Sequence, residues 1–233
     1  MTELLTSAQM RAIEAAAIAS GVVTGLELME RAGQGVVEAV MEEWPNLKSK
    51  PSLIARLRGL PARRKAVIFC GPGNNGGDGF VIARKLHQLG WTVVCYLWGD
   101  PERLPKDAKA NYLRWLDVGQ VYPFDASESR DVRLCEPFPD LWVDAIFGIG
   151  QSKELPELVT LMMQRVYYEQ NWCEAPIVAV DVPTGVDADT GKSLQTFLWC
   201  ADLTVTFHAK KVAHDADVEI DRCGKVVVAD IGL

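Results

Sequence analysis

Gly71-Pro72-Gly73-Asn74-Asn75-Gly76-Gly77-Asp78-Gly79 is the stretch that decides the fold. It follows a short apolar run at residues 66–70, which is typical of a buried strand, and it precedes residues 79–89, which are typical of a helix. Glycine loses more backbone freedom on folding than any other residue, so five glycines at one turn indicate that the backbone must approach something closely. Because a helix N-terminus presents free N–H groups and the positive end of a dipole, the turn is suited to a phosphate.

Strand-like and helix-like runs alternate along the chain after this point. The strand-like runs are 66–70, 92–98, 141–147, 177–182, 203–207 and 225–229. The helix-like runs are 79–89, 106–115 and 154–168. Continuous apolar strands that alternate with helices predict an α/β protein with a parallel sheet covered on both faces.

Two helices are predicted before the first strand. Thr6-Ser7-Ala8-Gln9 fits a capping box, and the alanine-rich helix that follows ends near Ser20. Thr24-Gly25-Leu26-Glu27 is a second capping box, and Trp44-Pro45 ends the helix that it begins. We expect both helices to pack onto the core of the sheet, so residues 1–233 form a single domain.

Composition excludes some classes of protein. The chain has 233 residues, a net charge of −7, and 48% hydrophobic and 24% charged residues, which argues against general nucleic-acid binding. It contains neither an apolar stretch of membrane-spanning length nor a secretory signal, which predicts no membrane contact and fits a cytoplasmic protein. The cysteines have neither metal-ligand nor redox spacing and are expected to be reduced and buried; they are Cys70, Cys95, Cys135, Cys173, Cys200 and Cys223.

The stretch from Asn46 to Lys65 is basic, and two interpretations of it remain open. It is a solvated connector with a short helix, or it is a patch that binds a partner or nucleic acid.

Two aspartates stand at the ends of predicted strands, where ligands bind in open α/β sheets. Asp144 follows an apolar run, and Asp181 is followed directly by the rigid turn Val182-Pro183-Thr184-Gly185. A carboxylate in such a place must be paired, hydrogen-bonded or bound to a cation. The alternatives are structural: Asp144 caps a nearby helix, and Asp181 stabilises its own turn.

The spacing Gly71-x-Gly73-x-x-Gly76 matches the dinucleotide fingerprint, yet the match is weak by itself. The acidic residue expected after the second strand is poorly placed, since Asp100 lies beyond Trp98-Gly99. Asp78 has two open interpretations: it is the N-cap of the helix, or it contacts a ligand directly.

The histidines carry no motif of nucleophilic catalysis. His208 is expected to border the pocket beside Lys210 and Lys211, and His214 to lie in a polar loop.

Three motifs together resemble the NAD(P)H-hydrate epimerase family, also described as the YjeF N-terminal or apolipoprotein A-I-binding-protein-like domain. They are the glycine stretch at 71–79, Asp-Ala-Ile-Phe-Gly at 144–148 and Asp-Val-Pro-Thr-Gly at 181–185. The resemblance covers essentially the whole chain. It implies a Rossmann-like three-layer α/β/α sandwich with a mostly parallel sheet, a homodimer, and epimerisation of hydrated NADH and NADPH.

The resemblance also implies site residues. A potassium ion would be bound by Asn75, Asp144 and Thr184, although the family usually has serine at the last position. The hydrated nucleotide would contact Asn74, Asn75, Gly76, Gly77, Asp78, Gly148, Ile149, Gly150, Gln151, Ser152, Lys153, Glu154 and Asp181. The loop after Phe207 departs from the family, because Lys210-Lys211-Val212 replaces its usual Lys-Pro-Gly.

The hydrated nicotinamide ring has a hydroxyl on the carbon next to the ring nitrogen, so inversion there requires proton transfer at oxygen. We expect Asp181 to be the acid–base residue, because a carboxylate on a stiff turn can serve both directions. A nucleotide-dependent dehydratase, fused or separate, is the expected functional partner. Two rivals remain open: an oxidoreductase that uses the intact cofactor, and a non-catalytic nucleotide- or protein-binding module of the same fold.

Overall fold

A single seven-stranded sheet organises the part of the chain that the computed structural model describes, residues 4–48, 63–124, 137–197, 199–214 and 222–233, with the backbone alone for 169–173. All of its ladders are parallel, and the strand order is β3-β2-β1-β4-β5-β6-β7. The strands are β1 (Lys65–Cys70), β2 (Thr92–Leu97), β3 (Val121–Pro123), β4 (Leu141–Ala145), β5 (Ile177–Val180), β6 (Leu203–Phe207) and β7 (Lys225–Ala229).

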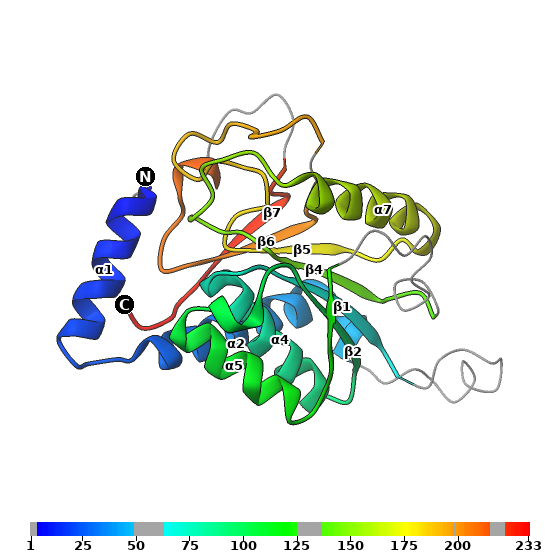
Figure 1. Cartoon of the computed structure of the whole chain (residues 1–233), viewed down its shortest axis with the longest axis horizontal. Coiled ribbons are helices and arrows are strands. Elements are labelled where there is room, and N and C mark those ends of the chain that lie inside the picture. The colour runs from blue at the N-terminus through cyan, green and yellow to red at the C-terminus, as the bar shows by residue number, and fades with distance from the viewer. Residues whose placement is uncertain (1–3, 49–62, 125–136, 198, 215–221) are drawn as a thin grey trace.

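Helices cover both faces of this sheet (Figure 1). The helix α7 (Glu157–Cys173) lies on one face, while α2 (Gly25–Glu43), α4 (Asn74–Gln88) and α5 (Lys106–Leu116) lie on the other. Ile68 and Cys70 of β1 join the core on the α2 and α4 side, whereas Val67 and Phe69 join the core under α7. Alternate residues of β1 therefore enter two cores, which is why residues 66–70 are all apolar. With helices on both faces of the sheet, the predicted three-layer α/β/α fold is confirmed.

Both predicted N-terminal capping boxes are present, at Thr6 and at Thr24. The helix α2 packs on the sheet and against α4 so closely that a Cβ on Gly33 would lie 2.5 Å from Val81. The first helix, α1 (Ser7–Ala19), stands at the side of the molecule (Figure 1) and buries only Ser7 and Met10. Both helices pack onto the core as expected, although α1 contributes only Met10 to it, with Ile13 and Ala17 packed against it.

Several boundaries differ from those predicted. The helix α4 begins at Asn74 instead of residue 79, with Gly73 as its N-cap, so the interpretation of Asp78 as the N-cap is wrong. The strand β5 ends at Val180 because Asp181 has a left-handed backbone, with φ of +68°. The strand β4 ends at Ala145, and α7 begins at Glu157 instead of residue 154. The three-residue strand β3 was not predicted, because so short a run shows no periodicity.

The order of the strands determines where a ligand can bind. The strand β1 lies between β2 and β4, so the chain leaves β1 toward one edge of the sheet and leaves β4 toward the other. The connections after β1 and β4 diverge at their carboxyl ends, which is the switch point where ligands bind in such sheets.

The smaller sequence predictions have mixed outcomes. Cys70, Cys95 and Cys223 are buried as expected, but Cys200 is exposed, and Cys135 and the side chain of Cys173 lie outside the described residues. Most of the basic stretch, residues 49–62, also lies outside them. At the C-terminal end of the basic stretch, the guanidinium of Arg64 lies 2.6 Å from the carboxylate of Asp140. No described helix has the length and hydropathy needed to cross a membrane.

Candidate active site

The glycine loop packs against the connection that follows β4. A Cβ on Gly71 would lie 1.8 Å from the carbonyl oxygen of Ile146, and a Cβ on Gly76 would lie 2.0 Å from that of Gly71. No other residue fits at either position without moving the backbone. The N-cap Gly73 has no side chain to satisfy the first N–H groups of α4, so these groups remain for a ligand.

A cavity of about 440 Å³ lies above this loop, at the carboxyl ends of the strands. Many of the predicted contact residues line it, namely Asn74, Asn75, Asp78, Gly148, Ile149, Gly150 and Asp181. The other lining residues are Arg11, Glu14, Pro72, Gly73, Ile146, Phe147 and Phe207. The cavity therefore brings together α1, the N-terminus of α4, the loop after β4 and the ends of β5 and β6.

The remaining predicted contacts lie outside this lining. Gly76 and Gly77 are buried, and a Cβ on Gly77 would point at Met29. The side chain of Gln151 accepts a hydrogen bond from the Gly185 amide at 2.7 Å and donates one to the Lys153 carbonyl at 3.1 Å, so it joins the two loops. Three exposed residues complete the set: Ser152, Lys153 and Glu154.

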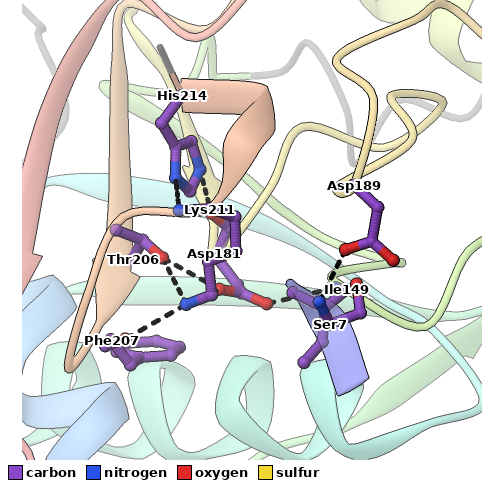
Figure 2. A network of polar contacts seen from close by, with 8 residues as sticks. All are labelled: Ser7, Ile149, Asp181, Asp189, Thr206, Phe207, Lys211 and His214. Atoms are coloured by element: carbon purple, nitrogen blue, oxygen red, sulfur yellow. Dashed lines mark hydrogen bonds and ion pairs between the residues drawn. The ribbon is translucent and has the colours of Figure 1, made fainter. Parts of the chain in front are cut away.

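Asp181 lies at the centre of a buried polar network (Figure 2). Its Oδ1 lies 2.9 Å from the ammonium of Lys211 and accepts a hydrogen bond from the hydroxyl of Thr206 at 3.0 Å. Its Oδ2 accepts one from the backbone amide of Ile149 at 3.1 Å. Three donors from three segments thus fix the orientation of this carboxylate.

Lys211 is only 1% exposed, and its ammonium has acceptors besides Asp181. It donates to the Thr206 hydroxyl at 2.7 Å and to the Phe207 carbonyl at 3.0 Å. Its backbone amide donates to Nδ1 of His214 at 2.9 Å, so Nε2 of that ring holds the proton and donates to the Asp181 carbonyl at 2.8 Å. His214 is buried on the short helix η3 (Val212–His214), so its predicted place in a polar loop is wrong.

The carboxyl groups of the cavity have different electrostatic environments. Burial by itself would raise the pKa of Asp181, but Lys211 and the Ile149 amide outweigh it and hold that pKa below the usual value. Burial raises the pKa of Asp78 well above its usual value, and the charges of Asp181 and Glu14 raise it further. Burial and then Asp181 also raise the pKa of Glu14. The surroundings therefore favour the ionised form of Asp181 and the neutral form of Asp78.

Asp144 and Thr184 meet directly, as the resemblance implies. The Thr184 hydroxyl donates to Oδ1 of Asp144 at 2.7 Å and accepts from the Phe147 amide at 3.0 Å, while the Thr184 amide donates to Oδ2 at 2.9 Å. Burial raises the pKa of Asp144 to about 6, although the hydrogen bonds from Thr184 and Ile146 lower it. A cation beside this carboxylate would stabilise its ionised form and so offset the cost of burying the charge.

Asn75 is the third implied potassium ligand. Its Nδ2 is buried without a hydrogen-bond partner, and its Oδ1 would lie 3.2 Å from a Cβ placed on Gly148, the neighbour of Phe147. A half-turn of the amide exchanges these two atoms, which would present an oxygen where the orphaned nitrogen lies. An amide, a carboxylate and a hydroxyl oxygen are the donors that hard cations take, so the residues present fit a potassium ion.

Other candidate sites are less well formed. Asp100 caps the short helix η2 (Pro101–Arg103) through the Glu102 amide at 2.9 Å and does not line the cavity. Phe207 lines the cavity, whereas His208 does not. Within the described residues, no three His, Cys, Asp or Glu side chains form a metal-binding group.

The sequence interpretation missed Arg11, Glu14, Thr206 and Lys211. Arg11 lies on α1, outside the three motifs, and its guanidinium donates to the Ile149 carbonyl at 3.0 Å. A signal for Lys211 was available, because a lysine follows the corresponding strand in the family. Glu14 and Thr206 carry no local signal.

Comparisons with known proteins identify the family of the chain. The model of the family described as YjeF-related protein N-terminus matches residues 25–213. Over its whole length the chain is 44% identical to the NAD(P)H-hydrate epimerase of Roseobacter litoralis and 43% identical to that of Rhodobacter capsulatus, each of them covered completely. It is 34% identical to the bifunctional NAD(P)H-hydrate repair enzyme of Moorella thermoacetica, over 99% of this chain and 40% of that protein.

The fold of a solved structure is also similar. The crystal structure of the yeast protein YNL200c matches with a TM-score of 0.74 and 26% identity, over 97% of this chain and 87% of that one. The chain therefore belongs to the family of YjeF-related N-terminal domains, that of the NAD(P)H-hydrate epimerases.

Proposed function

We propose that this protein is an isomerase that interconverts the R and S forms of hydrated NADH and NADPH at C6, as part of nicotinamide nucleotide repair. One observation carries the proposal: a helix N-terminus and the fixed carboxylate of Asp181 face one cavity, in a chain whose full-length relatives are named NAD(P)H-hydrate epimerases. The cavity volume of about 440 Å³ is within the roughly 300–1,000 Å³ of small-molecule sites.

The phosphates of the nucleotide would bind the free N–H groups at the start of α4. Arg11 is the basic member of the described cavity lining, and its guanidinium would offset part of their charge. Asp181 would take the proton of the C6 hydroxyl and return it after inversion. Its orientation supports this role, because three hydrogen-bond donors hold the carboxylate beside Gly148, at the wall of the cavity.

We propose also that Asn75, Asp144 and Thr184 bind a potassium ion. The unpartnered Nδ2 of Asn75 and the buried Asp144–Thr184 pair support this. When bound, the cation would offset the negative charge of the phosphates and carboxylates.

The cell would need a second activity to complete the repair. We propose a nucleotide-dependent dehydratase as the functional partner, since relatives such as that of Moorella thermoacetica are named bifunctional repair enzymes. We propose further that the protein acts as a homodimer, which the resemblance implies, and that it is located in the cytoplasm.

A coupled assay tests the function. A dehydratase that consumes one epimer is given a mixture of both epimers, and this protein is then added. We expect both epimers to be consumed completely. In the control with heat-denatured protein, the second epimer should remain largely intact over the same time. Consumption that stops at one epimer would contradict the proposal. The oxidoreductase rival is tested by adding NADH without its hydrate. We expect the absorbance of NADH to stay constant.

A further inference from the structure

We infer that Asp78 is a second catalytic residue, which donates a proton to the ring nitrogen of the substrate while Asp181 takes the proton of the C6 hydroxyl. The inference rests on the proposed epimerase function and adds a reaction route to it.

The position of Asp78 is the first support. It lies one turn after Asn74 on α4, and both residues line the 440 Å³ cavity together with Asp181. Asp78 also lines a neighbouring cavity of about 110 Å³ with Glu14 and Asp107. A residue on α4 thus reaches the same space as Asp181 from a different element of the fold.

The state of the Asp78 carboxyl group is the second support. The residue is 9% exposed, and its carboxyl accepts no hydrogen bond from the described residues. An isolated carboxylate is costly to bury, so the neutral acid is the stable form here. Its O–H has no acceptor among the described residues and is available to a ligand in the cavity.

Asp181 is the opposite case. Lys211, Thr206 and the Ile149 amide all donate to its carboxylate, which stabilises the anion. Two carboxyl groups in one cavity, one held neutral and the other held ionised, form the kind of pair that divides acid and base roles.

The chemistry of the substrate assigns these roles. Asp181 removes the hydroxyl proton, the C6–O bond becomes a carbonyl, and the C6–N1 bond breaks while N1 takes the proton of Asp78. Rotation about C5–C6 then exposes the other face of the aldehyde. N1 attacks C6 and returns its proton to Asp78, and the oxygen regains its proton from Asp181. The ring closes inverted, with no atom gained or lost.

The alternative route fits this pair less well. If the C6 hydroxyl left as water, Asp78 would protonate it and Asp181 would deprotonate the water that adds on the other face. Each carboxyl would then end in the protonation state that its surroundings disfavour. Ring opening restores both groups after every turnover, in either direction.

Asp78→Asn tests the inference directly. We expect kcat to fall by ~100-fold or more, as for loss of a general acid, with KM changed far less. The amide has nearly the same size and no charge to bury, so the melting temperature should not fall. Asp107→Asn is the matched control, because Asp107 lines only the smaller cavity, and it should keep wild-type activity. An Asp78→Asn protein within ~3-fold of wild type would overturn the inference.

A second measurement needs only the wild-type protein. Epimerisation in water enriched in oxygen-18 should give product that retains its original C6 oxygen at early times, after correction for the uncatalysed exchange. Label in every inverted molecule would overturn ring opening and hence the role of Asp78. Absence of any epimerisation by wild type would instead overturn the proposed function itself.

The pH profile gives a third readout. The charged residues that line the two cavities with Asp78 are Arg11 and Glu14 from α1, Asp107 from α5 and Asp181 after β5, and Lys211 pairs with Asp181. Glu14→Gln removes one negative charge near Asp78, so the alkaline limb of kcat should move to lower pH. An unmoved limb would contradict the role, since a merely structural Asp78 would not titrate with activity.

Discussion

The ammonium of Lys211 lies 2.9 Å from Oδ1 of Asp181, and both side chains are withdrawn from solvent. The same lysine binds Thr206 and Phe207, while its backbone reaches the Asp181 carbonyl through His214. Asp181, which directly follows β5, is therefore held through both its side chain and its main chain by one short segment, from the end of β6 to His214.

Removing one member of this pair should be costly. Lys211→Met leaves the Asp181 charge buried without its partner, and we expect a loss of about 3–5 kcal/mol in the free energy of unfolding. The double variant Lys211→Met/Asp181→Asn should recover much of this loss, because no lone charge remains. Denaturant unfolding of the four proteins measures the coupling. Additive losses would show that the two side chains do not interact.

His214 should make the free energy of unfolding depend on pH. Burial lowers its pKa to about 4, from about 6.5 in an unfolded chain, so only the unfolded state binds a proton between these values. Stability should therefore fall as pH drops from about 6.5 to about 4, by about 3 kcal/mol at the lower end. The measurement is the difference in unfolding free energy between wild type and His214→Gln across this window. A difference that is independent of pH would contradict the buried, neutral ring.

Gly148 should be needed for activity more than for folding. A Cβ there would lie 2.8 Å from Oδ2 of Asp181 and 3.2 Å from Oδ1 of Asn75, so a methyl group would occupy space between two site residues. We expect Gly148→Ala to fold and to raise KM or abolish turnover. Gly150→Ala is the comparison in the same loop, since its Cβ would meet only Arg11, at 3.8 Å, and its effect should be smaller. Equal kinetics for the two variants would contradict this.

The cation proposal predicts a specific stabilisation. A ligand at ten times its Kd adds about 1.4 kcal/mol, so replacing lithium by potassium should raise the melting temperature by roughly 3–6 °C. Thr184→Ser keeps the hydroxyl oxygen and should keep this increment, whereas Thr184→Val should lose it. Only the potassium-dependent rise in melting temperature is compared between variants. The melting temperatures themselves will differ, because the Thr184 hydroxyl also binds Asp144 and the Phe147 amide. An increment that survives in Thr184→Val would exclude this oxygen as a ligand.

Much of the fold could be predicted from local pattern. Strand runs such as 66–70 are apolar throughout because they contribute side chains to two cores, and the capping boxes at Thr6 and Thr24 mark helix starts unambiguously. The glycine stretch located the site, since Gly71 and Gly76 are forced by backbone contacts. These features depend on residues that are close together in the sequence, so they can be recognised from the sequence alone.

The electrostatics of the site could not be predicted in the same way. A lysine after a strand is usually a surface residue, and only the packing of the segment after β6 buries Lys211 against Asp181. Asp78 resembled a helix cap because the helix was expected five residues too late. Glu14 enters the cavity through the docking of α1, which the Ser7 amide secures on Asp189 at 2.6 Å (Figure 2). Each of these contacts joins segments far apart in sequence.

The most direct test of the proposed function follows a single purified epimer of hydrated NADH by chiral chromatography, with wild type and with Asp181→Asn. We expect wild type to bring the two epimers to equilibrium, and a folded Asp181→Asn protein to lose epimerisation by ~100-fold or more. No conversion by wild type above the uncatalysed rate would contradict the function. Near-normal conversion by the folded variant would contradict the role of Asp181.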